Sequence, residues 1–172
     1  WFHPDAIAII PIRKVLCETP WQIILFLQGM SLLVIGVRNT GITAWLSQTL
    51  MGLSSWGLTL AATGTGFLAA VLSAMFNNLP TVLLNAQAIQ QSTDIEPTVR
   101  EAMVYANAIG CAMGAKITPL GSVSTLLCLN FLTRQGFRIR WIPYSCIAFI
   151  LTIPILFISL LSLAIWLPWL IV

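Results

Sequence analysis

Charged residues are scarce in this sequence: eight lysines and arginines, five acids and one histidine occur among 172 residues. Residues 39–93 contain no charged residue, and none follows Arg140. So little charge excludes a soluble domain of this length. The net charge of +3 is scattered, which argues against a nucleic-acid partner. With a single histidine, His3, and no carboxylate pair in the apolar runs, enzyme chemistry is not expected.

Cysteines are few and irregularly spaced. They form no CxxC pair and have no histidine partners, which argues against a metal site. We interpret them as small buried apolar side chains, and we expect no cofactor. The four residues are Cys17, Cys111, Cys128 and Cys146.

Apolar residues, in contrast, make up 58% of the chain, and its mean hydropathy is +0.93. A membrane crossing needs ~20 mostly apolar residues, and several runs approach that length. We therefore predict an all-α integral membrane protein. The chain starts at Trp1 without a methionine, so we expect it to be part of a longer protein.

The apolar runs divide the chain into segments. Residues Ile42, Trp45, Leu46, Thr49 and Leu50 share one face of a short helix, a pattern typical of the membrane interface. The predicted segments are a surface loop or linker over 1–20, a span over 21–37, an interfacial helix over 41–53, a hairpin over 56–90, a broken helix over 99–133 and a last span over 141–170.

The sequence NNLP at 77–80 interrupts the fourth of these segments. After it only about eleven apolar residues precede a polar stretch, and at ~1.5 Å per residue they cover about half of the hydrocarbon layer. Amides and a proline are poorly tolerated against lipid but tolerated where backbone lines a protein cavity. We predict a re-entrant hairpin with 77–80 at its tip. The triplet GTG at 64–66 is more typical of close helix packing than of a binding loop.

A second interruption lies at 114–122, near the middle of the apolar stretch 99–133. Gly114, Pro119 and Gly121 are residue types that unwind a helix. A discontinuous transmembrane helix is expected here. A hairpin tip and a helix break at the same depth are the pattern of a secondary transporter.

Loop charges predict the orientation. Basic residues gather near the start of the chain and in the loop 134–140, whereas the loop 91–98 carries acids and no base. By the positive-inside rule the basic segments are cytoplasmic and the acidic loop is outside. The residues concerned are Arg13, Lys14, Arg134, Arg138 and Arg140 on one side, and Asp94 and Glu96 on the other.

Amides and hydroxyls of the two interruptions are the candidate substrate-binding groups. They are Asn77, Asn78, Thr81, Thr118, Gly121, Ser122 and Thr125. The alternatives are that the two asparagines cap helix ends, and that the hydroxyls of Thr118, Ser122 and Thr125 bond their own helix carbonyls.

Lys116 is the sole charged residue near mid-depth and is therefore a candidate for ion coupling. We expect a buried ammonium that hydrogen-bonds carbonyls freed by Gly114, Pro119 and the tip, or that pairs with an acid outside this chain. The alternative is a structural tether.

Four stretches carry a family resemblance. "PWQIILFLQGM", "NNLPTVLL", "EAMVYANAIGC" and "KITPLGSVSTLL" resemble, in this order and spacing, the C-terminal half of the arsenite efflux permeases, the arsenical pump membrane proteins. The resemblance covers roughly residues 12–170. The family is similar to the ion transporter superfamily, whose inverted repeats each contain a re-entrant hairpin and a discontinuous helix. This chain departs from the family pattern at Ala112, often an acid, and at Ala115, often a proline.

The resemblance implies proton-driven efflux of arsenite or antimonite across a bacterial inner membrane, in a multi-pass protein surrounded by lipid. This chain then supplies one repeat and needs an N-terminal half or a second chain. A soluble arsenite-stimulated ATPase and a homodimer are further expected partners. Because a cage of thiolates would retain its cargo, we predict that replacing all four cysteines with serine leaves arsenite resistance largely intact.

Two alternatives stay open. One is a truncated membrane fragment that transports nothing. The other is an anion or dicarboxylate carrier of the same superfamily, which needs a positive pocket, for which this chain offers Lys116 alone.

Overall fold

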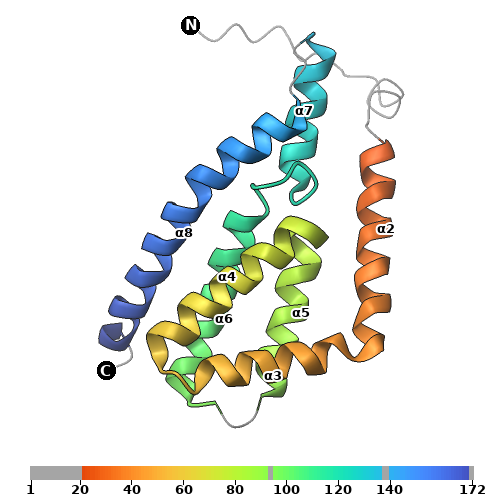
Figure 1. Cartoon of the computed structure of the whole chain (residues 1–172). Coiled ribbons are helices and arrows are strands. Elements are labelled where there is room, and N and C mark those ends of the chain that lie inside the picture. The colour runs from red at the N-terminus through yellow and green to blue at the C-terminus, as the bar shows by residue number, and fades with distance from the viewer. Residues whose placement is uncertain (1–20, 93–94, 137–139, 171–172) are drawn as a thin grey trace, which may run out of the picture.

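The computed structural model of the chain describes residues 21–92, 95–136 and 140–170 (Figure 1). Regular structure within these ranges is all helical, as expected. The elements are α2 (Trp21–Val37), the kinked turn η1 (Arg38–Ile42), α3 (Thr43–Ser54), α4 (Leu58–Phe76), α5 (Asn78–Gln91), α6 (Pro97–Gly114), α7 (Val123–Arg134) and α8 (Trp141–Leu170). The loop predicted over 1–20, with Arg13, Lys14 and Cys17, lies outside the described residues, as do Asp94 and Arg138.

Two of the described helices are long and apolar enough to cross a membrane, α4 and α8 over residues Trp141–Trp169. Helix α2 has the predicted bounds and 17 residues, about 26 Å of helix. Its side chains Leu25 and Leu32 are exposed, as lipid contact requires. The helices therefore agree with the membrane class predicted from composition.

Helices α4 and α5 form a hairpin with Asn77 as its turn, and Figure 1 shows them diverging from this turn. The interruption of the next helix is also present: α6 ends at Gly114 and α7 begins at Val123. The turn of the hairpin lies beside this interruption, and α7 continues beyond it (Figure 1). The 12 residues of α7 add about 18 Å of helix, so the hairpin covers only part of the height of α6 and α7. Re-entrance into the bilayer itself stays a prediction.

Small residues bring α4 and α6 into backbone contact. The helices run parallel, with Gly110 against Gly66 and Gly114 against Ala70. A Cβ at either glycine of α6 would collide with the carbonyl oxygen of its partner on α4. Gly110 and Gly114 thus form a GxxxG face, which lets membrane helices approach closely. The triplet 64–66 belongs to this packing, as predicted, and α4 continues through it unbroken.

Helix α8 packs one face on this pair. Its buried residues Leu156, Leu160 and Ala164 follow each other at intervals of four and join the cluster of small residues on α4 and α6. Leu160 sits over Gly66, where a Cβ would approach it to 2.5 Å. The remaining surface of α8, for example Ile158, is apolar and exposed.

Helix α3 runs across the open end of the hairpin (Figure 1). The predicted helix is present, but its apolar face is divided. Leu46 and Leu50 are buried in a cluster with residues of α4, α5 and α6, whereas Ile42 and Trp45 are exposed. The divided face arises because α3 packs on the hairpin with one side and leaves the adjoining side free.

Candidate functional site

The turn of the hairpin is Asn77, whose backbone has φ 81° and ψ 152°. It is the one described residue other than glycine with a positive φ. This backbone region is nearly reserved for glycine, and residues held in it concentrate at functional sites. Two hydrogen bonds hold the turn: the Asn77 N–H donates to the Ser73 carbonyl at 3.2 Å, and the Thr81 hydroxyl donates to the Asn77 carbonyl at 2.7 Å.

The hairpin turn contacts the helix interruption directly. The Asn78 N–H donates to the Gly121 carbonyl at 3.1 Å, which ties the start of α5 to the segment 115–122. The Thr118 hydroxyl donates to the Ala74 carbonyl in the last turn of α4 at 2.6 Å and accepts from the Gly121 N–H at 3.1 Å. The hairpin turn and the interruption are thus bonded to each other through the backbone of Asn78 and the side chain of Thr118.

Three of the predicted binding residues use polar groups to hold this junction: Thr81, Thr118 and Gly121. The alternative that Thr118 bonds a carbonyl of its own helix is wrong, because its hydroxyl reaches α4 instead. Gly121 has no room for a side chain, since a Cβ would lie 2.6 Å from the Ala115 carbonyl oxygen. These residues shape the junction rather than present free groups to it.

Four other predicted side chains keep their polar groups available. The Asn77 side chain is 4% exposed, yet its carboxamide has no hydrogen-bond partner among the described residues. Asn78, Ser122 and Thr125 are half-buried, and their side chains also make no hydrogen bond within the described ranges. The Asn77 amide atoms are not among the fully buried polar atoms that lack a partner, so they reach the surface of the junction and stay open to a polar ligand.

Four helix ends converge at this junction: the C-termini of α4 and α6 and the N-termini of α5 and α7 (Figure 1). Helix N-termini present partly positive N–H groups, and C-termini present partly negative carbonyls. Pro80 in the first turn of α5 has no N–H to present. The junction can therefore offer both donors and acceptors to a small polar molecule.

Lys116 lies in the same interruption but faces away from the turn. Its side chain is exposed, and its ammonium has no hydrogen-bond or ion-pair partner in the described part of the chain. The expected burial and the expected bonds to carbonyls of the break and tip are therefore wrong for this chain. The reason is that carbonyls at the break, including those of Met113, Gly114 and Thr118, already accept backbone N–H groups. Pairing with an acid outside this chain stays a prediction.

A buried polar network near the junction was not predicted. The Asn85 Nδ2 donates to the Asn107 Oδ1 at 3.0 Å, and the Asn107 Nδ2 donates to the Val82 carbonyl at 3.1 Å. The Cys111 thiol also donates to the Asn107 Oδ1, at 3.4 Å. The Ser73 hydroxyl donates to the Cys111 carbonyl at 2.8 Å, which links α4 to the same network. The sequence did contain a signal for this network, namely two asparagines inside apolar helices, because buried amides pair across membrane helices.

The cysteines are buried only in part, contrary to the prediction. Cys111 is buried, as expected, whereas Cys128 and Cys146 are exposed, because they lie on outward faces of α7 and α8. No group of three or more histidine, cysteine, aspartate or glutamate side chains that could hold a metal ion occurs within residues 21–92, 95–136 and 140–170.

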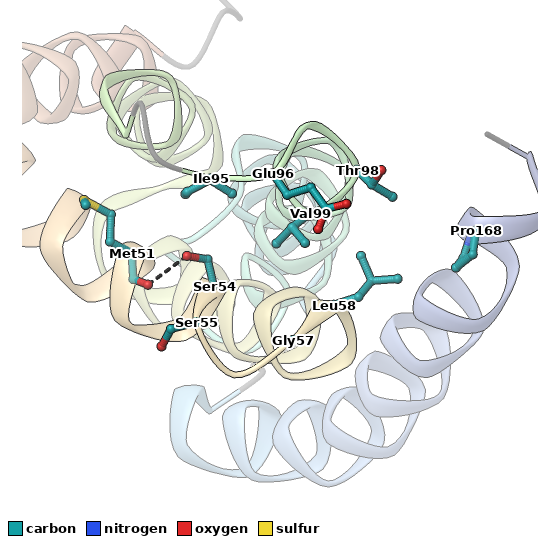
Figure 2. Close-up of a pocket in the computed structure, with 10 residues that line it drawn as sticks. All are labelled: Met51, Ser54, Ser55, Gly57, Leu58, Ile95, Glu96, Thr98, Val99 and Pro168. Atoms are coloured by element: carbon teal, nitrogen blue, oxygen red, sulfur yellow. Dashed lines mark hydrogen bonds between the residues drawn. The ribbon is translucent and has the colours of Figure 1, made fainter. Parts of the chain in front are cut away.

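A cavity of about 590 Å³ lies at the opposite end of α4 and α6 from the junction. Figure 2 shows its lining, which includes Ser54, Glu96 and Pro168, and the hydrogen bond of 2.8 Å from the Ser54 hydroxyl to the Met51 carbonyl. It contains none of the predicted binding residues, so we do not assign the site to it.

The fold and the junction define a helical membrane protein in which a hairpin turn meets an interrupted helix. Comparison with known sequences gives the family: the profile described as "Arsenical pump membrane protein" matches residues 5–167. The chain belongs to this family of arsenical pump membrane proteins. No solved structure matches the chain at a significant level.

Individual relatives agree. The arsenical pump membrane protein of Escherichia coli (strain K12) is 50% identical over 151 residues, which cover 88% of this chain and 35% of that protein. The one from Yersinia enterocolitica is 49% identical over the same shares. A putative arsenical pump membrane protein of Bacillus subtilis (strain 168) is 29% identical over 159 residues, 92% of this chain and 36% of its own length. The chain thus spans about a third of the length of these curated relatives.

Proposed function

We propose that this chain is part of an arsenite efflux permease and supplies one hairpin and one interrupted helix of its substrate site. The observation that carries the proposal is the junction of the two interruptions, where the Asn77 residue is only 4% exposed and its carboxamide makes no hydrogen bond among the described residues. The relatives, which are arsenical pump membrane proteins, supply the substrate class.

The chemistry of the junction suits this substrate. Arsenite at neutral pH is mostly the uncharged trihydroxide, a small molecule with hydroxyl groups that both donate and accept. Amide and hydroxyl side chains with helix ends can bind such a molecule without an ion pair. We assign the available groups of Asn77, Asn78, Ser122 and Thr125 to the substrate, and the bonded groups of Thr81, Thr118 and Gly121 to the shape of the site. Antimonite has the same form and is proposed as a second substrate.

Coupling to the proton gradient, across the inner membrane of a bacterium, is part of the proposal and rests on the family resemblance. The sequence-based assignment of coupling to Lys116 stays a prediction. The structure offers no contact in its favour, because the ammonium makes no contact with the hairpin turn. We place this chain as a C-terminal repeat that works with an N-terminal half or a second chain. A soluble arsenite-stimulated ATPase and a homodimer are proposed partners on the same ground.

The anion or dicarboxylate carrier is the less favoured function. Such a carrier needs a positive charge at the substrate, and the ammonium of Lys116 is exposed on the far side of the interruption. The groups available at the turn are uncharged amides and hydroxyls.

Everted membrane vesicles from cells that produce the full-length permease test the proposal. We expect energised vesicles to accumulate arsenite and antimonite, and a protonophore to abolish the accumulation. Vesicles that carry this chain without the rest of the permease should accumulate neither. Accumulation of succinate in place of arsenite would favour the dicarboxylate carrier. If the full-length protein accumulated neither, the remaining alternative would be a membrane protein that transports nothing.

A further inference from the structure

A groove runs between the helix interruption and the first turns of α8, on the side away from the hairpin turn. Its volume is about 630 Å³. Lys116 and Arg140 line one part of it, and the rest is lined by Met113 of α6 and by side chains of α8 that are apolar except for Tyr144 and Thr152. The Tyr144 hydroxyl donates to the Lys116 carbonyl at 3.1 Å, which ties the interruption to α8 at the groove.

The two cations in the groove are uncompensated. Both side chains are exposed, and neither charged group has an ion-pair or hydrogen-bond partner among the residues that the structure describes. The sequence contains no acid after Glu101, so α7 and α8 have no carboxylate to offer. This part of the groove is therefore a positive site that calls for an anion from outside the described chain.

The other part of the groove is a strip of apolar side chains on α8. Ile147, Leu151 and Ile155 follow each other at intervals of four, line the groove and are exposed. The first and last of them are eight residues apart, so the strip extends about 12 Å along the helix. A free inorganic anion would gain nothing from such a wall, whereas a hydrocarbon chain would bury apolar surface on it.

The start of α8 indicates where the positive part of the groove sits in the membrane. The helix has 30 residues, about 45 Å, which exceeds the ~30 Å of a hydrocarbon core. Arg140 directly precedes it and Trp141 and Tyr144 lie in its first turn, and such basic and aromatic residues mark the membrane interface. Lys116 is bonded to Tyr144 and shares its level. We infer from this that the cations lie at headgroup depth, rather than at the mid-depth expected for Lys116 from the sequence, and that the apolar strip runs deeper.

We propose that this groove is a binding site for an anionic phospholipid, with the phosphate against Lys116 and Arg140 and an acyl chain along Ile147, Leu151 and Ile155. Basic pockets between membrane helices bind anionic headgroups in this way. The lipid supplies the missing negative charge and covers the apolar strip at once. The site is separate from the proposed substrate junction, and its occupancy does not depend on the transported species.

Native mass spectrometry of the detergent-solubilised full-length permease tests the site. The probes are phosphatidylglycerol and phosphatidylcholine with the same acyl chains. We expect the parent to retain phosphatidylglycerol preferentially. Lys116→Gln and Arg140→Gln should each weaken retention about fivefold, the factor that corresponds to ~1 kcal/mol per cation near a membrane surface. Arg134→Gln removes an exposed cation of α7 that does not line the groove, and should leave retention unchanged.

A second variant tests the acyl chain and separates lipid from a free anion. Leu151→Trp keeps both charges and fills the apolar strip, so it should also weaken retention of phosphatidylglycerol. Loss of retention in the charge variants but not in Leu151→Trp, or displacement of the lipid by inorganic phosphate, would show a free-anion site and overturn the proposal. Equal retention by the parent and the Lys116→Gln/Arg140→Gln double variant would overturn it too. A parent that shows no preference for phosphatidylglycerol would also overturn it, and would indicate that the groove is covered by protein in the full-length permease.

Discussion

The hydroxyl of Thr118 lies 2.6 Å from the carbonyl oxygen of Ala74, 44 positions earlier in the chain, and donates to it. This bond satisfies a carbonyl that the end of α4 leaves without a helical partner. The same hydroxyl accepts from the Gly121 N–H, so this one side chain joins the last turn of α4 to the irregular segment that follows α6.

Replacing Thr118 with valine should loosen the junction. Thr118→Val keeps the shape and leaves the Ala74 carbonyl unpaired, at a cost of about 1–3 kcal/mol in stability, whereas the Gly121 N–H keeps its bond of 3.3 Å to the Thr118 carbonyl. We expect a lower Tm of the solubilised permease and reduced arsenite uptake in everted vesicles, while Thr118→Ser stays close to the parent. Thr133→Val is the matched control, because Thr133 is exposed and bonds Leu129 of its own helix. Equal effects of the two valine variants would contradict a special role of Thr118.

Asn77 allows its backbone and its side chain to be tested separately. Asn77→Gly suits the positive φ and removes the carboxamide, so the fold should be kept. Arsenite uptake should fall about fivefold, the factor for ~1 kcal/mol from one hydrogen bond to the substrate. Asn77→Ala should lower both Tm and uptake, because alanine is strained at this φ. Normal uptake by Asn77→Gly would remove the carboxamide from the site.

The contact between α4 and α6 should not tolerate a single methyl group. Gly110→Ala places a Cβ against the Gly66 carbonyl oxygen, and such overpacking destabilises by about 1–3 kcal/mol. A lower Tm and less folded protein in gel filtration are expected. Gly52→Ala in α3, which meets nothing within 4 Å, should be neutral or slightly stabilising. A neutral Gly110→Ala would mean that the helices are farther apart than described.

The asparagine pair can be tested by a double-variant cycle. Asn107→Leu leaves the Asn85 carboxamide buried without its acceptor and should destabilise by about 1–3 kcal/mol. Adding Asn85→Leu should restore part of the loss, because replacing both partners with apolar groups is nearly neutral. Tm values of the parent, the two single variants and the double variant provide the cycle. Additive losses would show that the two amides do not stabilise each other.

Lys116 has two predicted roles that one variant separates. A coupling role predicts that Lys116→Met alters the pH dependence of arsenite uptake. Lipid binding predicts an unchanged pH dependence together with reduced retention of phosphatidylglycerol. We expect the second result, since the ammonium is exposed beside Arg140 and has no contact with the hairpin turn. Uptake across a range of pH, in vesicles of fixed lipid composition, makes the measurement.

Much of the fold could be predicted from patterns along the chain. Asn77 to Pro80 interrupts a charge-free run, and Gly114, Pro119 and Gly121 interrupt the next. Both irregularities follow from residue types that end helices, which is why the hairpin turn and the break appear where they were predicted. The contact between the two interruptions could also be predicted, because they lie at a similar depth in their apolar stretches.

Side-chain directions within these elements could not be predicted in the same way. The rotation of the segment 115–122 decides that Thr118 turns toward α4 and Lys116 toward α8, and no periodicity governs an irregular turn. The pairing of Asn85 with Asn107 depends on the register between two helices joined by a loop. Such a register depends on contacts like that of Gly110 with Gly66, which appear only once the helices are placed side by side.

The glycine face between α4 and α6 also bears on movement. Backbone in contact with backbone leaves no compressible side chains between the helices, so one cannot slide along the other without a clash. The hairpin turn and the helix break are anchored to these two helices and bonded to each other. They therefore behave as a single rigid body, and access to the junction must change by displacement of this body against its surroundings rather than by parting of the turn from the break.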